Sequence, residues 1–577
     1  MKMNLNKRIA TFLILGTVAV GSWSCKKMLD VPIENNLDYT NAYKNVSDAD
    51  AAVLGLYGQF QGLQKLYIMQ NELRADLLDI TPRTSAELRD LSNHATAKNN
   101  SYIDPRPYYQ LIVNCNDVLK NFDKMNAERR MSVDDYNKHY SDIGALRTWI
   151  YLQLGIQYGS VPYITEALET VDELNGLANY PRISFDTLLD RLIAFTENLP
   201  YKEVYAYPTG TPIVATIDGS STAKLFISKL FLLGDLHLWK GNYLKASEYY
   251  AKCMNAENGN TNDNFRFNFY KVSNTNDNTG YTRIGVIHNR YQDESTLVNS
   301  VDDGWRGIFG LPNTTNPWNS EWFWALPYNP SFKPINPMID LVSPTKSYQI
   351  RPSQAAKDNW NSQTQFSGIP NDARARLSFS NGLGGEMITK FTDNGGKWGI
   401  YRAALLHLRF AEAANRDGQT KLGWAFLNIG LTNTYYVGAY TAGVIAPINE
   451  AEQNTMITPY ATNSPYYFDA RKTADISGTW YRNSGVRGRA GVVATDVALQ
   501  NDMIGLEGKL IDEAALELAF EGNRWPDLVR IARRQNNPAF LADRVYQKLL
   551  KSGNPNASTI RAKLMNPANW YLPFEWK

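Results

Sequence analysis

Aromatic side chains crowd into one short stretch of the chain, and they alternate there with asparagines and prolines. The rings are those of Trp305, Trp318, Trp322, Phe323, Trp324, Tyr328 and Phe332. A sugar has an apolar face of C–H bonds on which an aromatic plane can stack, and a rim of hydroxyls that polar side chains can hydrogen-bond. The stretch therefore predicts a glycan-binding site, with Trp305, Trp318, Trp322 and Trp324 as candidate contacts. The alternative is that these rings pack the loops onto the protein or meet a protein partner.

No recognisable catalytic motif accompanies these rings. The chain contains neither Gly-x-Ser-x-Gly nor His-Glu-x-x-His. Its five histidines are scattered without metal-ligand spacing. The Asn-rich stretch 274–278 resembles part of a calcium loop but lacks the bidentate glutamate that closes one. A glycosidase needs only two carboxylates, and among 57 acidic residues such a pair carries no information. We predict a binding protein that has no enzymatic activity, metal or cofactor.

The charge balance argues against nucleic acid as a partner. The chain has 59 basic and 57 acidic residues, and the first 24 residues hold three of the basic ones and no acid. Without them, 56 basic residues face 57 acids, a net charge of −1. Binding to the phosphate backbone needs a basic excess, which this chain lacks.

The N-terminus has the pattern of a lipoprotein signal peptide. Three basic residues precede an apolar run at 9–20, which is too short to span a bilayer. The run ends in Gly-Ser-Trp-Ser before Cys25, which resembles a bacterial lipobox except that Ser22 stands where Leu, Val or Ile is usual. We expect residues 1–24 to be removed and Cys25 to carry acyl chains that anchor the protein to a membrane. The alternative is an ordinary secretory signal with an incidental cysteine.

Hydrophobic periodicity predicts a mainly α fold. A helix is expected to begin at Ser47, with Asp50 in capping-box spacing and Ala51, Leu54, Leu56 and Tyr57 on its apolar face. Further helices are expected at 108–122, 142–158 and 184–199. Segments 222–256 and 405–431, and less completely 154–158 and 512–534, resemble tetratricopeptide helix pairs. Such pairs must stack to bury their faces, and the resemblance to tetratricopeptide repeats implies a right-handed superhelical scaffold. Residues 81–102, 259–400 and 438–500 are expected to be mainly loops, with short helices and strands in the later two.

A stretch near the C-terminus, 516–530, predicts two helices that meet at a sharp corner. Gly522 and Asn523 interrupt the helical pattern, and Pro526 suits the first turn of the second helix. Acids are spaced four apart before the corner and arginines follow it, so we expect the two sets to face each other: Glu513, Glu517 and Glu521 against Arg530, Arg533 and Arg534. We interpret this corner as a structural clasp.

This stretch resembles the C-terminal signature of the SusD/RagB family, nutrient-binding outer-membrane lipoproteins of Bacteroidetes. The Gly-x-Val-Pro turn at 159–162, the segment 485–489 and the ending 570–576 are also similar to that family. The resemblance implies a signal peptide at 1–24, a SusD-like N-terminal helical region at 25–290, and a C-terminal region at 291–577 with ligand loops and further tetratricopeptide-like helices.

The resemblance also implies a function in nutrient uptake and polysaccharide utilisation. Such proteins capture an oligosaccharide for a SusC-like TonB-dependent transporter, and they are lipid-anchored at the outer membrane, here expected to face the cell exterior. Starch-binding members use an Arg and an Asn in the first polar loop. Arg83 matches that Arg, and Asn99 and Asn100 both fit the Asn. The Trp of those members is absent, and Tyr102 is the aromatic nearby, which argues against starch but not against another glycan. Peptide capture on a RagB-like scaffold and a pure interaction scaffold remain alternatives.

Overall fold

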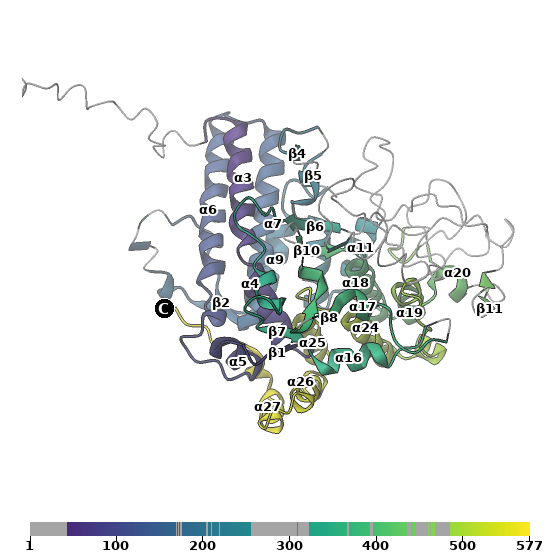
Figure 1. The fold of residues 1–577 in the computed structure, drawn as a ribbon. Helices are drawn as coiled ribbons and strands as arrows, with labels where there is room; N and C mark the ends of the chain where they lie inside the picture. Colours follow the sequence, from purple (N-terminus) through teal and green to yellow (C-terminus); the bar gives the residue numbers. More distant parts are fainter. Residues whose placement is uncertain are drawn as a thin grey trace, which may run out of the picture.

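Helices dominate the computed structural model of this protein (Figure 1). The structure describes residues 43–254, 308–309, 322–435, 440–441, 444–445, 460–467 and 485–576, with short gaps inside some of these ranges. In this part of the chain, strands occur only as two-stranded antiparallel pairs. The predicted mainly α class is thus confirmed.

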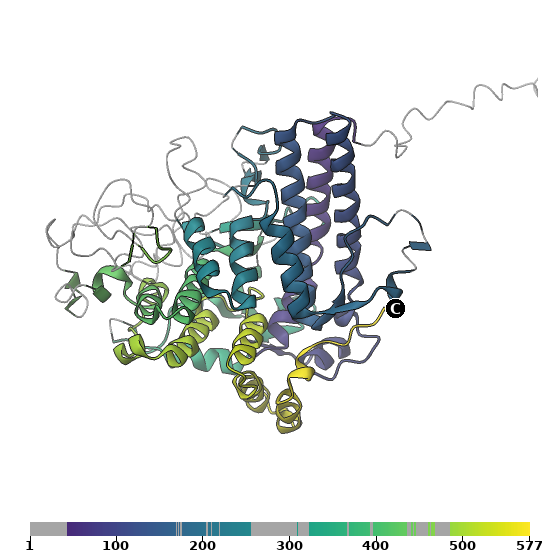
Figure 2. The ribbon, with the colours of Figure 1, turned by 180° about the vertical axis from the view of Figure 1, so that it is seen from behind.

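The first half of the described chain forms a bundle of long helices. Its members are α3 (Val46–Gln61), α6 (Arg106–Ala127), α7 (Val133–Tyr158) and α9 (Phe185–Glu197), which lie side by side in both ribbon views (Figure 2). The helix α7 ends at Gly159, whose φ of 72° reverses the chain. The expected helices at 108–122, 142–158 and 184–199 are therefore present.

The start of α3 differs from the expectation. Asn45, not Ser47, is the N-cap: its side chain accepts the N–H of Ser47 at 2.8 Å, while Asp48 accepts the N–H of Asn45 at 3.1 Å. The helix begins earlier than predicted because this pair satisfies more of the free N–H groups of the first turn. Its buried face consists of Ala49, Val53, Leu56, Tyr57 and Phe60, so the expected Ala51 and Leu54 lie outside it.

Two of the predicted tetratricopeptide-like pairs are present as closely packed helix pairs, namely α10 (Lys229–Lys240) with α11 (Tyr243–Met254) and α18 (Ala403–Arg416) with α19 (Thr420–Leu427). The segment 512–534 forms α24 (Met503–Glu517) and α25 (Arg524–Arg534), which follow each other at the corner but make few contacts with each other. Gly241 and Gly418, at φ of 87° and 81°, make the turns of the first two. A Cβ built on Gly234 would lie only 2.3 Å from the Tyr250 ring, so this glycine sets the distance between α10 and α11.

Short elements connect these helices. In the first half they are α4 (Gln64–Ile68), the π-helix η2 (Met69–Leu73), α5 (Ala86–Ser92), η3 (Ser101–Ile103) and the strand pairs β1 (Leu78–Ile80) with β7 (Ile350–Pro352) and β2 (Ser160–Pro162) with β3 (Arg182–Ser184). Later come β6 (Trp322–Pro327) with β10 (Lys397–Arg402), α15 (Met338–Val342), α16 (Gln354–Asn361), α17 (Arg374–Ser378), and β8 (Phe379–Gly382) with β9 (Gly385–Ile388). The chain ends in α26 (Ala539–Lys551) and α27 (Ala557–Leu564).

These elements agree with the expected loops and add one helix to them. Residues 81–102 are mainly loop, as expected, but the short helix α5 and the start of η3 lie within them. The described part of 259–400 has the short strands and helices that were expected. The remainder of that segment, most of 438–500 and the Asn-rich stretch 274–278 lie outside the described residues.

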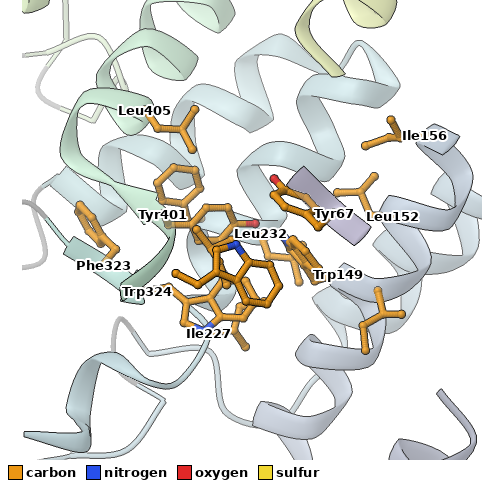
Figure 3. Packing of buried hydrophobic residues seen from close by; sticks show 14 of the residues in the cluster. Tyr67, Trp149, Leu152, Ile156, Ile227, Leu232, Phe323, Trp324, Tyr401 and Leu405 are labelled. Carbon is orange, nitrogen blue, oxygen red and sulfur yellow. The ribbon is translucent and has the colours of Figure 1, made fainter. Parts of the chain in front are cut away.

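The core joins the N-terminal bundle to the later strands. Phe60 of α3 stacks on Trp324 of β6, with ring centroids 5.4 Å apart, and on Trp398 of β10, at 4.8 Å. Trp149 of α7 meets Trp324 edge-on at 5.4 Å, and Figure 3 shows these two rings side by side with Tyr67. The two regions predicted on either side of residue 290 therefore share one core. The boundary itself lies outside the described residues and stays a prediction.

Cys115 and Cys253 are buried free thiols, as expected. Within the described ranges, no helix combines the length and the apolar character needed to cross a membrane. The predicted signal peptide and Cys25 precede residue 43, where the description begins.

Candidate functional site

The C-terminal corner is built around a buried glutamate from η2. The carboxylate of Glu72 accepts backbone N–H groups from the turn between α24 and α25: Gly522 at 2.7 Å, Asn523 at 3.0 Å, Phe520 at 3.2 Å and Arg524 at 3.3 Å. Phe520 and Gly522 have φ of 73° and 90°, which aims these N–H groups inward. Burial raises the pKa of Glu72 to about 8, although the N–H groups lower it. The corner is a clasp between distant parts of the chain.

The acids and arginines of the corner do not face each other, contrary to the prediction. Glu517 bonds Arg402 at 2.8 Å and Arg374 at 2.9 Å. Glu521 bonds Arg402 and Lys390, both at 2.7 Å. Glu513 likewise pairs with Arg374 and Arg487. These acids share one side of the helix and its end, and that side is turned toward residues 374–402 rather than toward α25.

The arginines of α25 have other partners. Arg530 and Arg534 bond Glu412 of α18, at 2.7 Å and 2.5 Å. Arg533 bonds Asp186 at the start of α9, at 2.9 Å. The corner thus ties α24 and α25 to five other segments of the chain, namely η2, residues 374–402, Arg487, α18 and α9, and its charges are engaged in holding the fold.

The tryptophans of β6 pack the core, which corrects their assignment as ligand contacts. Trp322 is 1% exposed and Trp324 is 0% exposed. Their indole N–H groups donate to the backbone oxygens of Ile308 at 2.7 Å and Leu225 at 2.8 Å. Because both faces of such rings are covered, no sugar can stack on them. Trp305 and Trp318 lie outside the described residues, so their role stays a prediction.

One ring of the aromatic stretch is open to solvent. Phe332 is 66% exposed and Ile335, three residues on, is 61% exposed. A local turn lies at each end of their loop, since Asn329 accepts the N–H of Ser331 at 2.8 Å and Asn336 accepts that of Met338 at 3.0 Å. Figure 1 shows the segment between β6 and β7 passing in front of α3 and α4, on the side where α5 is visible. The flanking prolines were the sequence signal for an exposed loop here.

Arg83 is exposed in the turn before α5. Its Nη1 donates to the backbone oxygen of Pro344 at 2.9 Å, and its guanidinium carbon lies 6.0 Å from the centre of the Tyr348 ring. Tyr348 is a neighbour that the sequence did not reveal, because it comes 265 positions later and no local pattern marks it. These contacts hold the guanidinium in one orientation at the surface.

The two candidate asparagines have different environments. Asn99 is exposed. Asn100 is 2% exposed; its Oδ1 accepts the N–H of Tyr102 at 2.9 Å and its Nδ2 donates to the Glu87 backbone at 2.8 Å. Tyr102 is itself 7% exposed, with Lys65 Nζ 5.5 Å from its ring centre. Asn100 and Tyr102 therefore stabilise the turn, and Asn99 is the one with its side chain at the surface.

The exposed groups suit recognition rather than catalysis. Arg83 and Asn99 supply hydrogen-bond donors, and Phe332 supplies an apolar face. No group of three or more His, Cys, Asp or Glu residues that could hold a metal ion occurs in the ranges that the structure describes.

Similar proteins are found among curated sequences and among solved structures. No family model matches the chain. A curated SusD-like protein, P38 of Formosa agariphila, is 28% identical over 194 residues, which is 32% of this chain and 36% of that protein. The match thus spans about a third of the length of that relative.

Solved structures resemble most of the chain. A SusD superfamily protein of Bacteroides thetaiotaomicron has a TM-score of 0.55 at 16% identity, covering 92% of this chain and 95% of that one. A SusD-like carbohydrate-binding protein of Bacteroides fragilis has a TM-score of 0.54 at 14% identity, covering 86% and 88%. The surface glycan-binding protein A of Bacteroides uniformis has 0.54 at 15% identity, covering 92% and 96%. The chain therefore has the fold of these solved structures, and the resemblance found in the sequence is confirmed at the level of the fold.

Proposed function

We propose that this protein is a non-catalytic lipoprotein that captures an oligosaccharide at the cell surface and passes it to a SusC-like TonB-dependent transporter of the outer membrane. Two proteins of the same fold are described as carbohydrate-binding and as glycan-binding, which supports a glycan as the ligand. A lipid at Cys25 would keep the binding face near the transporter. Residues 1–24 would be the signal peptide, and the anchored protein would face the exterior.

The geometry of Arg83 is the observation that carries this proposal. Its Nη1 is fixed on Pro344, whereas its Nε and Nη2 make no hydrogen bond within the described residues. A guanidinium held beside an aromatic ring loses little side-chain entropy when it binds a ligand. Its remaining N–H groups can donate to the hydroxyls of a sugar.

We assign the ligand contacts to the exposed groups among these candidates. Arg83 and Asn99 bind the hydroxyl rim, and Phe332 offers a stacking surface. Trp305 and Trp318 are retained as proposed contacts, whereas Trp322, Trp324, Asn100 and Tyr102 are assigned to packing. An oligosaccharide would contact several of these groups at once, which suits a binding protein for chains rather than single sugars.

Peptide capture is the second candidate, and the same arginine favours it. The free Nε and Nη2 of Arg83 form a fork that matches a carboxylate as well as a diol. A peptide would bind through its C-terminal carboxylate, and its affinity would fall when that group is amidated. Neutral oligosaccharides would then fail to displace the bound peptide.

A binding screen of the soluble protein, residues 26–577, tests the proposal. Plant, host and microbial oligosaccharides are screened by intrinsic tryptophan fluorescence, and hits are measured by calorimetry. We expect Arg83→Ala to weaken binding of a hit about tenfold or more, because hydrogen bonds from a charged donor are lost. Arg561→Ala is the matched control, since Arg561 is a partly exposed arginine of α27 paired with Asp543.

Three results would contradict the proposal. If no glycan of the panel binds but peptides with a free C-terminal carboxylate do, the second candidate is favoured. Hydrolysis of a bound glycan would make the protein an enzyme. Equal affinity of Arg83→Ala and the parent protein for every hit would remove Arg83 from the site.

A further inference from the structure

The short helix α5 lies between the two exposed polar residues of the candidate site. Arg83 precedes it by three residues and Asn99 follows it by seven. Figures 1 and 2 show that α5 lies close to the C-terminal helices α26 and α27, at the end of the molecule away from the top of the bundle. Side chains of α5 make hydrogen bonds both to the segment before the helix, which carries Arg83, and to the segment after it, which carries Asn99.

Glu87 of α5 holds the turn that carries Asn99. Its carboxylate accepts both the backbone N–H and the hydroxyl of Ser101, each at 2.8 Å. Its backbone oxygen accepts the side-chain amide of Asn100 at 2.8 Å. Glu87 therefore accepts three hydrogen bonds, which fix Asn100 and Ser101, the two residues directly after Asn99.

Arg89, two residues further along α5, holds the turn that carries Arg83. Its Nε donates to the backbone oxygen of Thr84 at 2.9 Å. Its Nη2 donates to the backbone oxygens of Pro82 at 2.9 Å and Thr81 at 3.2 Å. The guanidinium thus closes the turn on both sides of Arg83.

A buried lysine of α26 anchors α5 itself. Lys548 is 1% exposed, and its Nζ donates to the hydroxyl of Ser92 at 3.1 Å and to the backbone oxygen of Leu73 at 2.7 Å. Ser92 is the last residue of α5. Asn554 adds a bond to Asn93 at 2.7 Å, directly after the helix.

We propose that α5 is the positioning element of the ligand site, with Glu87 and Arg89 as positioning residues that aim Asn99 and Arg83 and with Lys548 as their anchor on α26. This inference rests on the proposed function for its biological meaning. Its structural content is independent of the ligand. Outer residues of this kind determine how precisely a binding group is held.

Amide hydrogen exchange in heavy water tests the positioning without any ligand. We expect Glu87→Ala to speed exchange about tenfold at 99–103, and to leave 81–85 unchanged, because it removes hydrogen bonds on one side only. Arg89→Ala should speed exchange at 81–85 and leave 99–103 unchanged. Lys548→Met should speed exchange in both turns. Asp90→Ala is the matched control, since the Asp90 side chain makes no hydrogen bond or ion pair with the described residues, and it should change neither turn.

Each other outcome overturns the inference. Unchanged exchange in both turns would show that α5 does not hold them. Faster exchange throughout the protein would show a general structural role. If an oligosaccharide of the panel binds, Glu87→Ala and Arg89→Ala should each lower the affinity for it about tenfold, because the binding groups are then held less precisely. Asp90→Ala should leave the affinity unchanged. If no oligosaccharide binds, the proposed function fails, while the exchange result still decides whether α5 positions the turns.

Discussion

At the scale of single residues, the corner between α24 and α25 depends on a glycine. Gly522 has a φ of 90°, and a Cβ there would lie 2.1 Å from the Tyr67 ring. Gly522→Ala should therefore lower the free energy of unfolding by about 2–4 kcal/mol, through backbone strain and overpacking together. Gly553→Ala is the control, because Gly553 has a φ of 72° but open space around it. Chemical denaturation compares the two, and an equal cost would show that the contact with Tyr67 is unimportant.

The pH dependence of stability can be predicted for Glu72. Burial raises its pKa from 4.5 to about 8 in the folded protein. A carboxyl group with a raised pKa contributes stability that is complete below pH 4.5 and is lost as pH rises through about 8. Glu72→Gln keeps an oxygen for three of the N–H groups and does not ionise. Compared with the parent protein, this variant should gain stability as pH rises from 5 to about 8, as measured by urea unfolding. A constant difference across that range would show that Glu72 ionises with an ordinary pKa.

The sequence could not separate contact residues from packing residues at this scale. Trp322 and Trp324 are two apart in a strand, yet every residue from Trp322 to Leu326 is buried, so no alternation marked an outward face. Asn99 and Asn100 are adjacent and chemically identical. Only the bonds of Asn100 to Glu87 and Tyr102 distinguish them.

At the scale of elements, close helix contacts depend on small residues. Gly234→Ala would place a Cβ 2.3 Å from the Tyr250 ring and push α10 from α11. We expect a loss of about 1–3 kcal/mol in the free energy of unfolding. Gly58→Ala on the exposed face of α3 meets nothing within 4 Å, and it should instead stabilise the protein by about 1 kcal/mol. Thermal unfolding of both variants tests whether Gly234→Ala lowers the stability and Gly58→Ala raises it. A loss of stability in both would contradict this account.

The long helices could be predicted because their signals are local. Periodic apolar residues and glycine turns lie within each segment, and these identified α7, α10 and α18. The helix α5 was missed because it has only seven residues, lies in a polar segment and is held by Lys548 of α26. A short helix stabilised by distant contacts leaves no periodicity long enough to recognise.

At the scale of the whole molecule, buried charges join segments that are far apart in the sequence. Glu517 and Glu521 have their partners more than 100 positions earlier, at Arg374, Lys390 and Arg402. The spacing of the acids was visible in the sequence, but it does not show which cation meets them. The nearest arginines in sequence, those of α25, therefore gave the wrong pairing.

Glu517 is the centre of this network, and it offers the strongest test of the whole assembly. It is 0% exposed and bonds Arg402 and Arg374 at once. Glu517→Gln keeps the shape but leaves two buried guanidinium groups facing an amide. Removing one partner of a buried ion pair costs about 3–5 kcal/mol, because the remaining charge is unbalanced.

The matched control is Lys551→Ala, whose pair with Asp358 is 36% and 41% exposed and should contribute less than about 1 kcal/mol. Urea unfolding measures both variants. The cost for Glu517→Gln should persist in 1 M salt, which screens exposed pairs far more than buried ones. If salt removes it, or if both variants cost the same, the network does not hold the later segments to α24. A persistent cost would mean that the C-terminal corner maintains the frame on which α5 and the proposed ligand site are built.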